Sequence, residues 1–306
     1  MTARWQPLEA GAMRVLVTGG TGFVGTALCH ALRGAGHEVI VVTRAPGHVD
    51  GAAIGWDGVS DAVRASDALV NLAGEPLASG RWNRQRKQLI RDSRVLATRT
   101  LIDALAAGEP RPAVLVNASA VGYYGPRGDE PLDESAGPGT GFLADVCRAW
   151  EEETLAAERL GVRVVRLRLG VVLAAGGGAL SRMLRPFRAF VGGPLGSGRQ
   201  WMSWIHRDDV TGLVVDALAN DAYRGPVNAT APQPVTNRDF ATMLGRTLAR
   251  PAWLPTPAFA LRLALGEMAE LLLTGQRVLP GVANRFGYPW RYPELGAALR
   301  ASVRRR

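Results

Sequence analysis

Short apolar runs rich in β-branched residues alternate with segments of helical periodicity along the first half of the chain. The runs at 14–18 ("RVLVT") and 38–42 ("EVIVV") predict buried strands, and the apolar spacing between them predicts a helix that ends near Gly36. The alternation continues through "DALVNLA", a helix from about 84 to 107, "AVLVNAS", a helix around 143–160 and "VRVVRLRLG". Buried strands that alternate with helices predict an α/β fold with a doubly wound parallel sheet.

The pattern changes after Gly170. Residues 171–205 mix a glycine-rich loop with a basic amphipathic stretch, which predicts an excursion out of the sheet plane on the substrate side. Strand and helix patterns then return, and the chain from 236 onward is helical and interrupted by prolines. We therefore expect an N-terminal extension at 1–12, a main domain at 13–235 that includes the excursion, and a smaller, mostly helical C-terminal lobe at 236–306.

The composition is that of a globular protein. A chain of 306 residues with 47% hydrophobic content can bury one substantial core and a smaller second lobe. No run approaches the ~18 apolar residues that span a bilayer, and the first residues lack the apolar stretch of a secretory signal. We therefore expect a cytoplasmic location and no membrane partner.

Charge and cysteines add little. The net charge of +9 favours nucleic-acid binding only weakly, because Lys87 is the only lysine and much of the arginine stands beside Asp and Glu. Cys29 and Cys147 have neither metal-ligand spacing nor a disulfide framework, and we expect both to be small core residues. The sequence therefore predicts no nucleic-acid partner and no metal site.

The segment "VTGGTGFVG" joins the first predicted strand to the first predicted helix. Glycines there allow a tight turn and let the backbone approach a pyrophosphate, while the helix N-terminus offers free N–H groups to the anion. A glycine-rich turn without a ligand is the alternative. The turn predicts a dinucleotide-binding, Rossmann-type domain, with these residues at the pyrophosphate: Gly19, Gly22, Phe23, Val24 and Gly25.

The end of the second strand bears on the choice of cofactor. An acidic residue there would accept hydrogen bonds from a ribose 2′-hydroxyl, but this chain has Thr43 and Arg44. A guanidinium can pair with a 2′-phosphate, so the sequence favours NADP over NAD. The alternative is that Arg44 only begins a surface loop.

The sequence from Met13 nearly to the C-terminus resembles the extended short-chain dehydrogenase/reductases, and within them atypical epimerase-family proteins with a C-terminal domain of unknown function. The resemblance rests on "VLVTGGTGFVG", "VNLAGEPL", "RWNRQRKQLIRDSR", "SAVGYYG", "VRLRLGVVLAAGGGAL", "GGPLGSGRQWMSWIHRDDV" and "RYPELGAAL". It implies that Leu72, Ala73 and Gly74 line the nicotinamide side of the cofactor. It also implies that Arg94 lies near the dinucleotide, although a solvated helix face would explain that arginine equally well.

The family's proton-transfer residues are only partly present. The resemblance puts Ser119 at the position of the family's serine, but the following helix has apolar residues where a Tyr-x-x-x-Lys pair is expected. In one interpretation Ser119 holds a substrate oxygen and Tyr124 or Tyr123 relays a proton. In the other, these side chains only complete the strand end and pack over the cofactor. His206 is a further possible acid or base, but a structural turn with Asp208 or Asp209 as helix cap is favoured.

Two functions remain open at this stage. The first is an NADP-dependent oxidoreductase of the epimerase/dehydratase type that acts on a small polar or nucleotide-linked molecule, with Ser119 and Tyr124 as catalytic residues. The second is a non-catalytic NADP(H)-binding protein that signals the state of the cofactor to a partner, which the missing Tyr-Lys pair favours. A homodimer is compatible with the sequence, which does not establish one.

Overall fold

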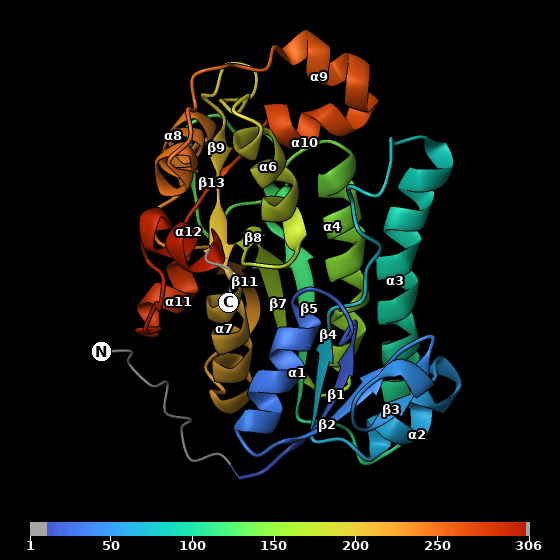
Figure 1. Cartoon of the computed structure of the whole chain (residues 1–306). Coiled ribbons are helices and arrows are strands. Elements are labelled where there is room, and N and C mark those ends of the chain that lie inside the picture. Colours follow the sequence, from blue (N-terminus) through green and yellow to red (C-terminus); the bar gives the residue numbers. More distant parts are fainter. Residues whose placement is uncertain (1–10, 304–306) are drawn as a thin grey trace.

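The computed structural model describes residues 11–303, so most of the extension expected at 1–12 lies outside the described residues. Its main sheet has seven strands: β1 (Arg14–Thr18), β2 (Glu38–Val42), β3 (Ala53–Ile54), β4 (Ala68–Asn71), β5 (Val114–Ala120), β7 (Arg163–Leu169) and β11 (Gly225–Ala229). Their order is β11-β7-β5-β4-β1-β2-β3, and all neighbours run parallel (Figure 1). The predicted doubly wound α/β fold is confirmed.

Helices cover both faces of the sheet because successive strand residues point to opposite sides. Val15 and Val17 share a core cluster with α1 (Gly25–Gly34) and α7 (Arg207–Ala219). Leu16, between them, belongs to the cluster on the other face. The helices on that second face are α2 (Val59–Arg64), α3 (Arg84–Ala106), α4 (Phe142–Glu153) and α5 (Leu155–Arg159).

That second face changes from apolar to polar toward the carboxyl ends of the strands. Leu16, Leu69, Leu115 and Val164 pack in its core cluster. Two residues further along each strand, on the same face, come Thr18 of β1, Asn71 of β4, Asn117 of β5 and Arg166 of β7. Four residues further along come Ser119 of β5 and Arg168 of β7. The carboxyl ends of parallel strands are where such sheets bind ligands, so these side chains lie at the edge where a site is expected.

The helix expected around 143–160 is in fact two helices. Thr154 separates α4 from α5, and both its backbone N–H and its hydroxyl donate to the carbonyl of Glu151. These contacts reach back three residues and replace the regular four-residue bond. The hydroxyl of Thr154 competes with backbone N–H groups for a helical carbonyl and so divides the helix. This local effect cannot be recognised from the spacing of apolar residues.

The segment at 171–205 lies outside the seven-stranded sheet and packs with C-terminal residues. It contains β8 (Val171–Leu173), α6 (Gly178–Arg188), β9 (Trp201–Met202) and most of β10 (Trp204–His206), which pairs with β8. Helix α6 shares a core cluster with α8 (Asn237–Leu248) and α12 (Leu295–Val303). The division of the chain into domains stays a prediction.

The remaining elements are short. The strands β6 and β13 pair with each other, and β12 pairs with β9. Their bounds, with those of the other helices, are: η1 (Pro46–His48), η2 (Trp56–Gly58), η3 (Val121–Tyr124), β6 (Pro131–Leu132), β12 (Val235–Thr236), α9 (Ala258–Leu265), η4 (Gly266–Ala269), α10 (Glu270–Leu273), β13 (Arg277–Val278) and α11 (Gly281–Arg285). Among residues 11–303, no helix is both long enough and apolar enough to cross a membrane.

Candidate functional site

The turn between β1 and α1 is packed so closely that it requires glycine. Gly19 has φ +69°, and a Cβ there would lie 2.5 Å from the carbonyl oxygen of Leu72. A Cβ on Gly25 would lie 2.1 Å from the carbonyl oxygen of Gly19. No side chain caps the N-terminus of α1, where Val24 is the N-cap residue. The N–H of Thr26 donates to the carbonyl of Gly22 at 2.9 Å, whereas the N–H of Gly25 has no partner among residues 11–303 and can bind an anion.

The end of β2 presents a cation to solvent. Thr43 follows the strand directly, and its hydroxyl accepts a hydrogen bond from the N–H of Ala45 at 3.3 Å. Arg44 is exposed, and among the described residues no carboxylate forms an ion pair with it. Its guanidinium is therefore available to a phosphate group at this edge of the sheet.

A buried asparagine that the sequence analysis missed holds the loop at 72–74. The Oδ1 atom of Asn71 accepts hydrogen bonds from Thr18 Oγ1 at 2.5 Å and from the N–H of Ala73 at 3.2 Å. Its Nδ2 donates to Asn117 Oδ1 at 2.6 Å and to Thr98 Oγ1 at 2.8 Å. The loop is thereby fixed against the glycine turn. The sequence did contain a signal for this role: Asn71 ends the apolar run "ALVN", and a buried amide needs hydrogen-bond partners.

Arg94 supports the same loop from α3. Its Nη1 donates to the carbonyl of Ile90 at 2.8 Å and its Nη2 to the carbonyl of Glu75 at 3.1 Å. A Cβ on Gly74 would lie 3.2 Å from the guanidinium carbon. Burial lowers the pKa of Arg94. The guanidinium is thus bonded to backbone carbonyls, and the predicted proximity to a dinucleotide stays a prediction.

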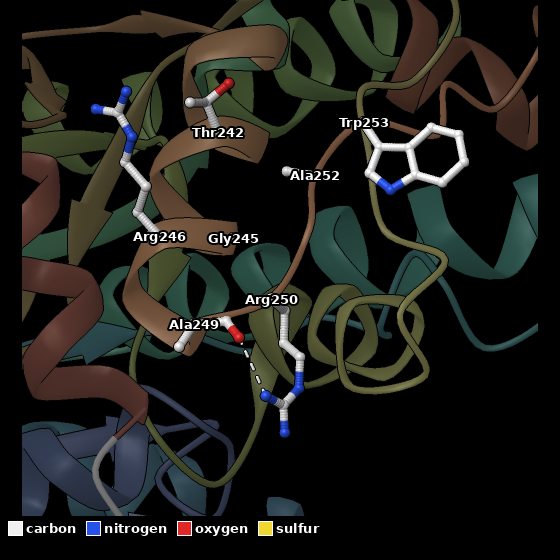
Figure 2. A pocket seen from close by; sticks show the side chains of 7 residues that line it. All are labelled: Thr242, Gly245, Arg246, Ala249, Arg250, Ala252 and Trp253. Atoms are coloured by element: carbon white, nitrogen blue, oxygen red, sulfur yellow. Dashed lines mark hydrogen bonds between the residues drawn. The ribbon is translucent and has the colours of Figure 1, made fainter.

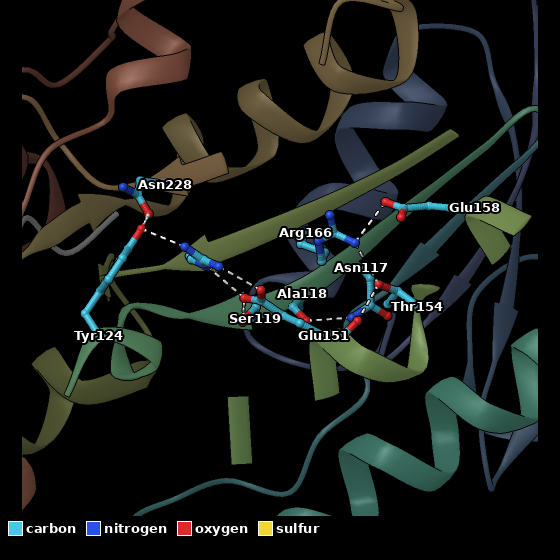
Figure 3. A network of polar contacts seen from close by, with 10 residues as sticks. Asn117, Ala118, Ser119, Tyr124, Glu151, Thr154, Glu158, Arg166 and Asn228 are labelled. Carbon is cyan, nitrogen blue, oxygen red and sulfur yellow. Dashed lines mark hydrogen bonds and ion pairs between the residues drawn. The ribbon is translucent and has the colours of Figure 1, made fainter. Parts of the chain in front are cut away.

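Ser119 belongs to a buried polar network at the ends of β5, β7 and β11 (Figure 3). Strand register puts Ser119 beside Arg168 and Arg168 beside Asn228. The hydroxyl of Ser119 donates to Glu151 Oε1 at 2.7 Å. Arg168 donates through Nε and Nη2 to the two oxygens of the same carboxylate, both at 2.8 Å. The serine is therefore held by an ion pair that is itself buried.

Tyr124 closes the other end of this network. Its side chain is 0% exposed. The phenolic oxygen accepts from Arg168 Nη1 at 2.9 Å, and its proton is donated to Asn228 Oδ1 at 2.7 Å. Burial raises the pKa of Tyr124 to about 12, and the nearby Arg168 only partly opposes this. The phenol is therefore neutral near pH 7 and fully bonded within the protein.

The cation beside the tyrosines comes from β7. The guanidinium carbon of Arg168 lies 3.5 Å from the centre of the half-buried Tyr123 ring. Arg127, which the sequence placed four residues after Tyr123, pairs instead with Glu130 at 2.9 Å. Arg168 and its partner Glu151 were missed because they are 17 residues apart and meet only when α4 packs across β7.

The positions of α4 where a Tyr-Lys pair is expected carry apolar residues and a cysteine. Phe142 packs edge-on against Trp82, with ring centres 5.2 Å apart. Cys147 is buried, as is Cys29, and burial raises the pKa of the Cys147 thiol to about 12. This part of α4 therefore contributes packing at the site and no ionisable group that titrates near neutrality.

His206 caps α7, the role that the sequence analysis assigned to Asp208 or Asp209. Its Nδ1 accepts from the N–H of Asp208 at 3.2 Å. Burial lowers the pKa of His206 to about 4, so the neutral ring can accept this bond. Asp209 instead accepts from the N–H groups of Arg291 and Tyr292, which ties the C-terminal residues to α7.

A surface hollow lies apart from the glycine turn and the buried polar network. A shallow hollow of about 400 Å³ lies on α8 and the residues after it, lined by Thr242, Gly245, Arg246, Ala249, Arg250, Ala252 and Trp253 (Figure 2). None of these residues belongs to the predicted site. Within residues 11–303, no group of three or more His, Cys, Asp or Glu side chains is arranged to hold a metal ion.

Sequence comparisons agree with the fold. A profile of the NAD dependent epimerase/dehydratase family matches residues 15–229. A domain of unknown function, DUF1731, matches residues 256–302. The epimerase family protein SDR39U1 homolog, chloroplastic, of Arabidopsis thaliana is 44% identical over 94% of this chain and 86% of its own length.

Solved structures are similar over nearly the whole chain. The crystal structure of human epimerase family protein SDR39U1 (isoform2) with NADPH has a TM-score of 0.87 and 37% identity, covering 95% of this chain and 99% of that one. The nucleoside-diphosphate sugar epimerase from Corynebacterium glutamicum has a TM-score of 0.80 and 36% identity, covering 97% of this chain and 59% of that one. The glycine turn, the parallel sheet and these matches agree: the chain belongs to the NAD dependent epimerase/dehydratase family.

Proposed function

We propose that this protein is an NADP(H)-dependent oxidoreductase of the epimerase/dehydratase type that works in the reducing direction on a small polar or nucleotide-linked molecule. The glycine turn, the cation at the end of β2 and a hydroxyl at the end of β5 support the proposal. The similar human structure with NADPH supports the cofactor. The substrate side is the excursion at 171–205 together with the C-terminal lobe.

The residues proposed to hold NADP(H) form three groups. The pyrophosphate lies at the glycine turn, the 2′-phosphate at the end of β2 and the nicotinamide beside the loop that Asn71 fixes. The residues are Gly19, Gly22, Phe23, Val24 and Gly25; Thr43 and Arg44; and Leu72, Ala73, Gly74 and Arg94. Bound NADPH supplies a hydride to an electrophilic carbon of the substrate.

The resting protonation states suit the reducing direction: the hydroxyls of Ser119 and Tyr124 carry their protons, and no free base lies beside them among the described residues. Taking a proton from a substrate alcohol needs a phenolate or another base, and the pKa of Tyr124, raised to about 12, keeps that phenol neutral. The carboxylate of Glu151 is already paired through both oxygens with Arg168. Reduction needs only a donor for the oxygen that gains charge. We assign this role to Ser119, whose hydroxyl hydrogen can rotate from Glu151 to the substrate, and the final proton comes from water.

The experiment follows NADPH oxidation by the purified protein against a panel of carbonyl compounds. With an accepted substrate, we expect Ser119→Ala to lower kcat by roughly tenfold to a hundredfold, the usual effect of losing one hydrogen-bond donor to a developing oxyanion. The Kd for NADPH should stay unchanged. Loss of turnover together with loss of NADPH binding would contradict the role of Ser119. No oxidation with any carbonyl compound would contradict the reductase.

Tyr124→Phe separates positioning from catalysis. The change removes a buried hydroxyl from Arg168 and Asn228, so we expect the free energy of unfolding to fall by about 1–3 kcal/mol. We expect the Kd for NADPH to stay the same and the pH dependence of kcat/KM to show no tyrosine titration between about pH 6 and 9. If turnover disappears while the melting temperature is unchanged, Tyr124 is the proton donor and the assignment to water is wrong.

Arg44→Gln tests the choice of NADP(H) over NAD(H). Removing the exposed guanidinium takes away a partner for the 2′-phosphate, so we expect NADPH to bind about tenfold more weakly. Binding of NADH, which lacks that phosphate, should not change. Isothermal titration of both cofactors provides the measurement. An equal loss for both cofactors would mean that Arg44 does not contact the 2′-phosphate.

A second candidate is a non-catalytic NADP(H)-binding protein that signals the state of the cofactor to a partner. The observation that favours it is that the hydroxyls of Ser119 and Tyr124 are both bonded inside the protein. Affinity capture with NADP⁺ and with NADPH would separate the two functions. A partner held in only one redox state, together with no turnover, supports the regulator. Equal capture in both states contradicts it.

A cytoplasmic location and a small-molecule substrate belong to the same proposal, and a homodimer is the simplest oligomer to expect. A fluorescent fusion tests the location, and sedimentation velocity tests the oligomeric state. Retention of the protein in a membrane fraction would contradict the cytoplasmic location. A monomer at all concentrations would contradict the homodimer.

A further inference from the structure

Arg207 lies against the glycine turn although it is far from it in the sequence. It is the first residue of α7, which packs beside α1. Its guanidinium carbon lies 4.9 Å from the centre of the Phe23 ring. Its Nη1 is 3.5 Å from the carbonyl oxygen of Phe23, at the outer limit of a hydrogen bond. The guanidinium is therefore held at the turn by stacking more than by that bond.

The charge of Arg207 has no counterion among residues 11–303. The neighbouring acids are directed elsewhere: Asp208 lies 3.4 Å from Arg291, and Asp209 accepts the N–H groups of Arg291 and Tyr292. The Nε of Arg207 is buried and has no hydrogen-bond partner within the described part of the chain. A buried guanidinium nitrogen without a partner is costly, so such a group in a native protein calls for an explanation, such as a bound anion or water.

The position is also unfavourable for a cation by itself. Arg207 stands in the first turn of α7 and beside the start of α1, so two helix N-termini with partial positive charge lie next to it. Acidic residues stabilise such ends and basic residues do not. An anion at the glycine turn would be attracted by both helix ends and by Arg207 together.

The surroundings of Phe23 keep Arg207 in this place. A Cβ on Gly177 would lie 2.6 Å from the Phe23 ring, and one on Gly178 would lie 2.7 Å from it. These glycines start α6, so the ring is covered closely by the excursion. A ring fixed in this way gives the guanidinium a rigid surface to stack on, which reduces the entropy lost when it binds a ligand.

We propose that Arg207 is a ligand of the cofactor pyrophosphate, reaching the glycine turn from the substrate side of the sheet. The inference rests on the proposed binding of NADP(H). It assigns the two cations to different phosphates of the cofactor: Arg44 to the 2′-phosphate at the adenosine end and Arg207 to the central pyrophosphate, which NADPH and NADH share.

The test uses three probes against the full chain: NADPH, NADH and adenosine 2′-monophosphate, which carries the 2′-phosphate but no pyrophosphate. Arg207→Met keeps an apolar stem over Phe23 and removes the charge. We expect this variant to bind NADPH and NADH more weakly by the same factor, about tenfold to a hundredfold, and to bind adenosine 2′-monophosphate with unchanged affinity. Arg207→Lys should restore part of the loss. Arg44→Gln is the matched control. It should weaken the binding of NADPH and of adenosine 2′-monophosphate but not the binding of NADH.

Each outcome has one meaning. Unchanged affinities in Arg207→Met, or a loss confined to the two probes with a 2′-phosphate, overturn the assignment. Weaker binding of all three probes means that the variant distorts the whole site, which also overturns the assignment. In that case the melting temperature of the ligand-free variant is also lowered. If the wild-type chain does not bind NADPH, the proposed function itself is contradicted. If the wild-type chain binds NADPH and the Arg207 variant binds it equally well, only the role of Arg207 is contradicted.

Discussion

Arg168→Ala should lower the free energy of unfolding by about 3–5 kcal/mol, the usual cost of leaving one partner of a buried ion pair alone. Arg168 is 3% exposed and neutralises the carboxylate of Glu151, which is 8% exposed. The change also takes a donor from Tyr124. Chemical denaturation followed by fluorescence measures the loss, and a change of less than 1 kcal/mol, on the order of a surface pair, would contradict the buried network.

Arg166→Ala is the matched control on the same strand. Arg166 lies two residues earlier and pairs with Glu158, whose side chain is 39% exposed. We expect a loss of at most about 1 kcal/mol because solvent compensates the remaining charge. Combining Arg168→Met with Glu151→Leu should cost less than Arg168→Ala alone, since no isolated charge stays buried. A double variant that is less stable than Arg168→Ala would mean that packing, not charge, accounts for the loss.

Gly25→Ala should reduce NADPH binding by roughly tenfold to a hundredfold, because it moves the N–H groups that we propose bind the phosphates. Its Cβ would lie 2.1 Å from the carbonyl oxygen of Gly19, so the turn must open. We also expect about 1–3 kcal/mol of lost stability from overpacking. Titration calorimetry and thermal unfolding measure the two effects separately.

Gly34→Ala, at the other end of α1, controls for the change of residue type. A Cβ there meets nothing within 4 Å, and alanine is the better helix former. We expect unchanged NADPH binding and a gain of up to about 1 kcal/mol in stability. If both glycine variants bind NADPH as the wild type does, the close packing of the turn does not matter for binding.

Residues near one another in the sequence were predicted well. The glycine turn, the strand at 14–18 and the sheet class follow from local spacing, because a βα turn and two-residue alternation are properties of short segments. The division between α4 and α5 was missed, since Thr154 acts through its hydroxyl and not through apolar periodicity. The cap of α7 was assigned to the wrong residue because a histidine accepts that bond only when burial keeps it neutral.

The sequence by itself determined the α/β class, the glycine turn between β1 and α1 and the absence of a Tyr-Lys pair, all of which depend on residue type and spacing. Only the tertiary structure decided which cation meets which hydroxyl. Ser119, Arg168 and Asn228 come together by strand register, Glu151 by helix packing and Arg207 by the contact of α7 with the turn. The partner of a buried charge is set by long-range packing, and the energy of such pairs depends on burial that no local pattern encodes.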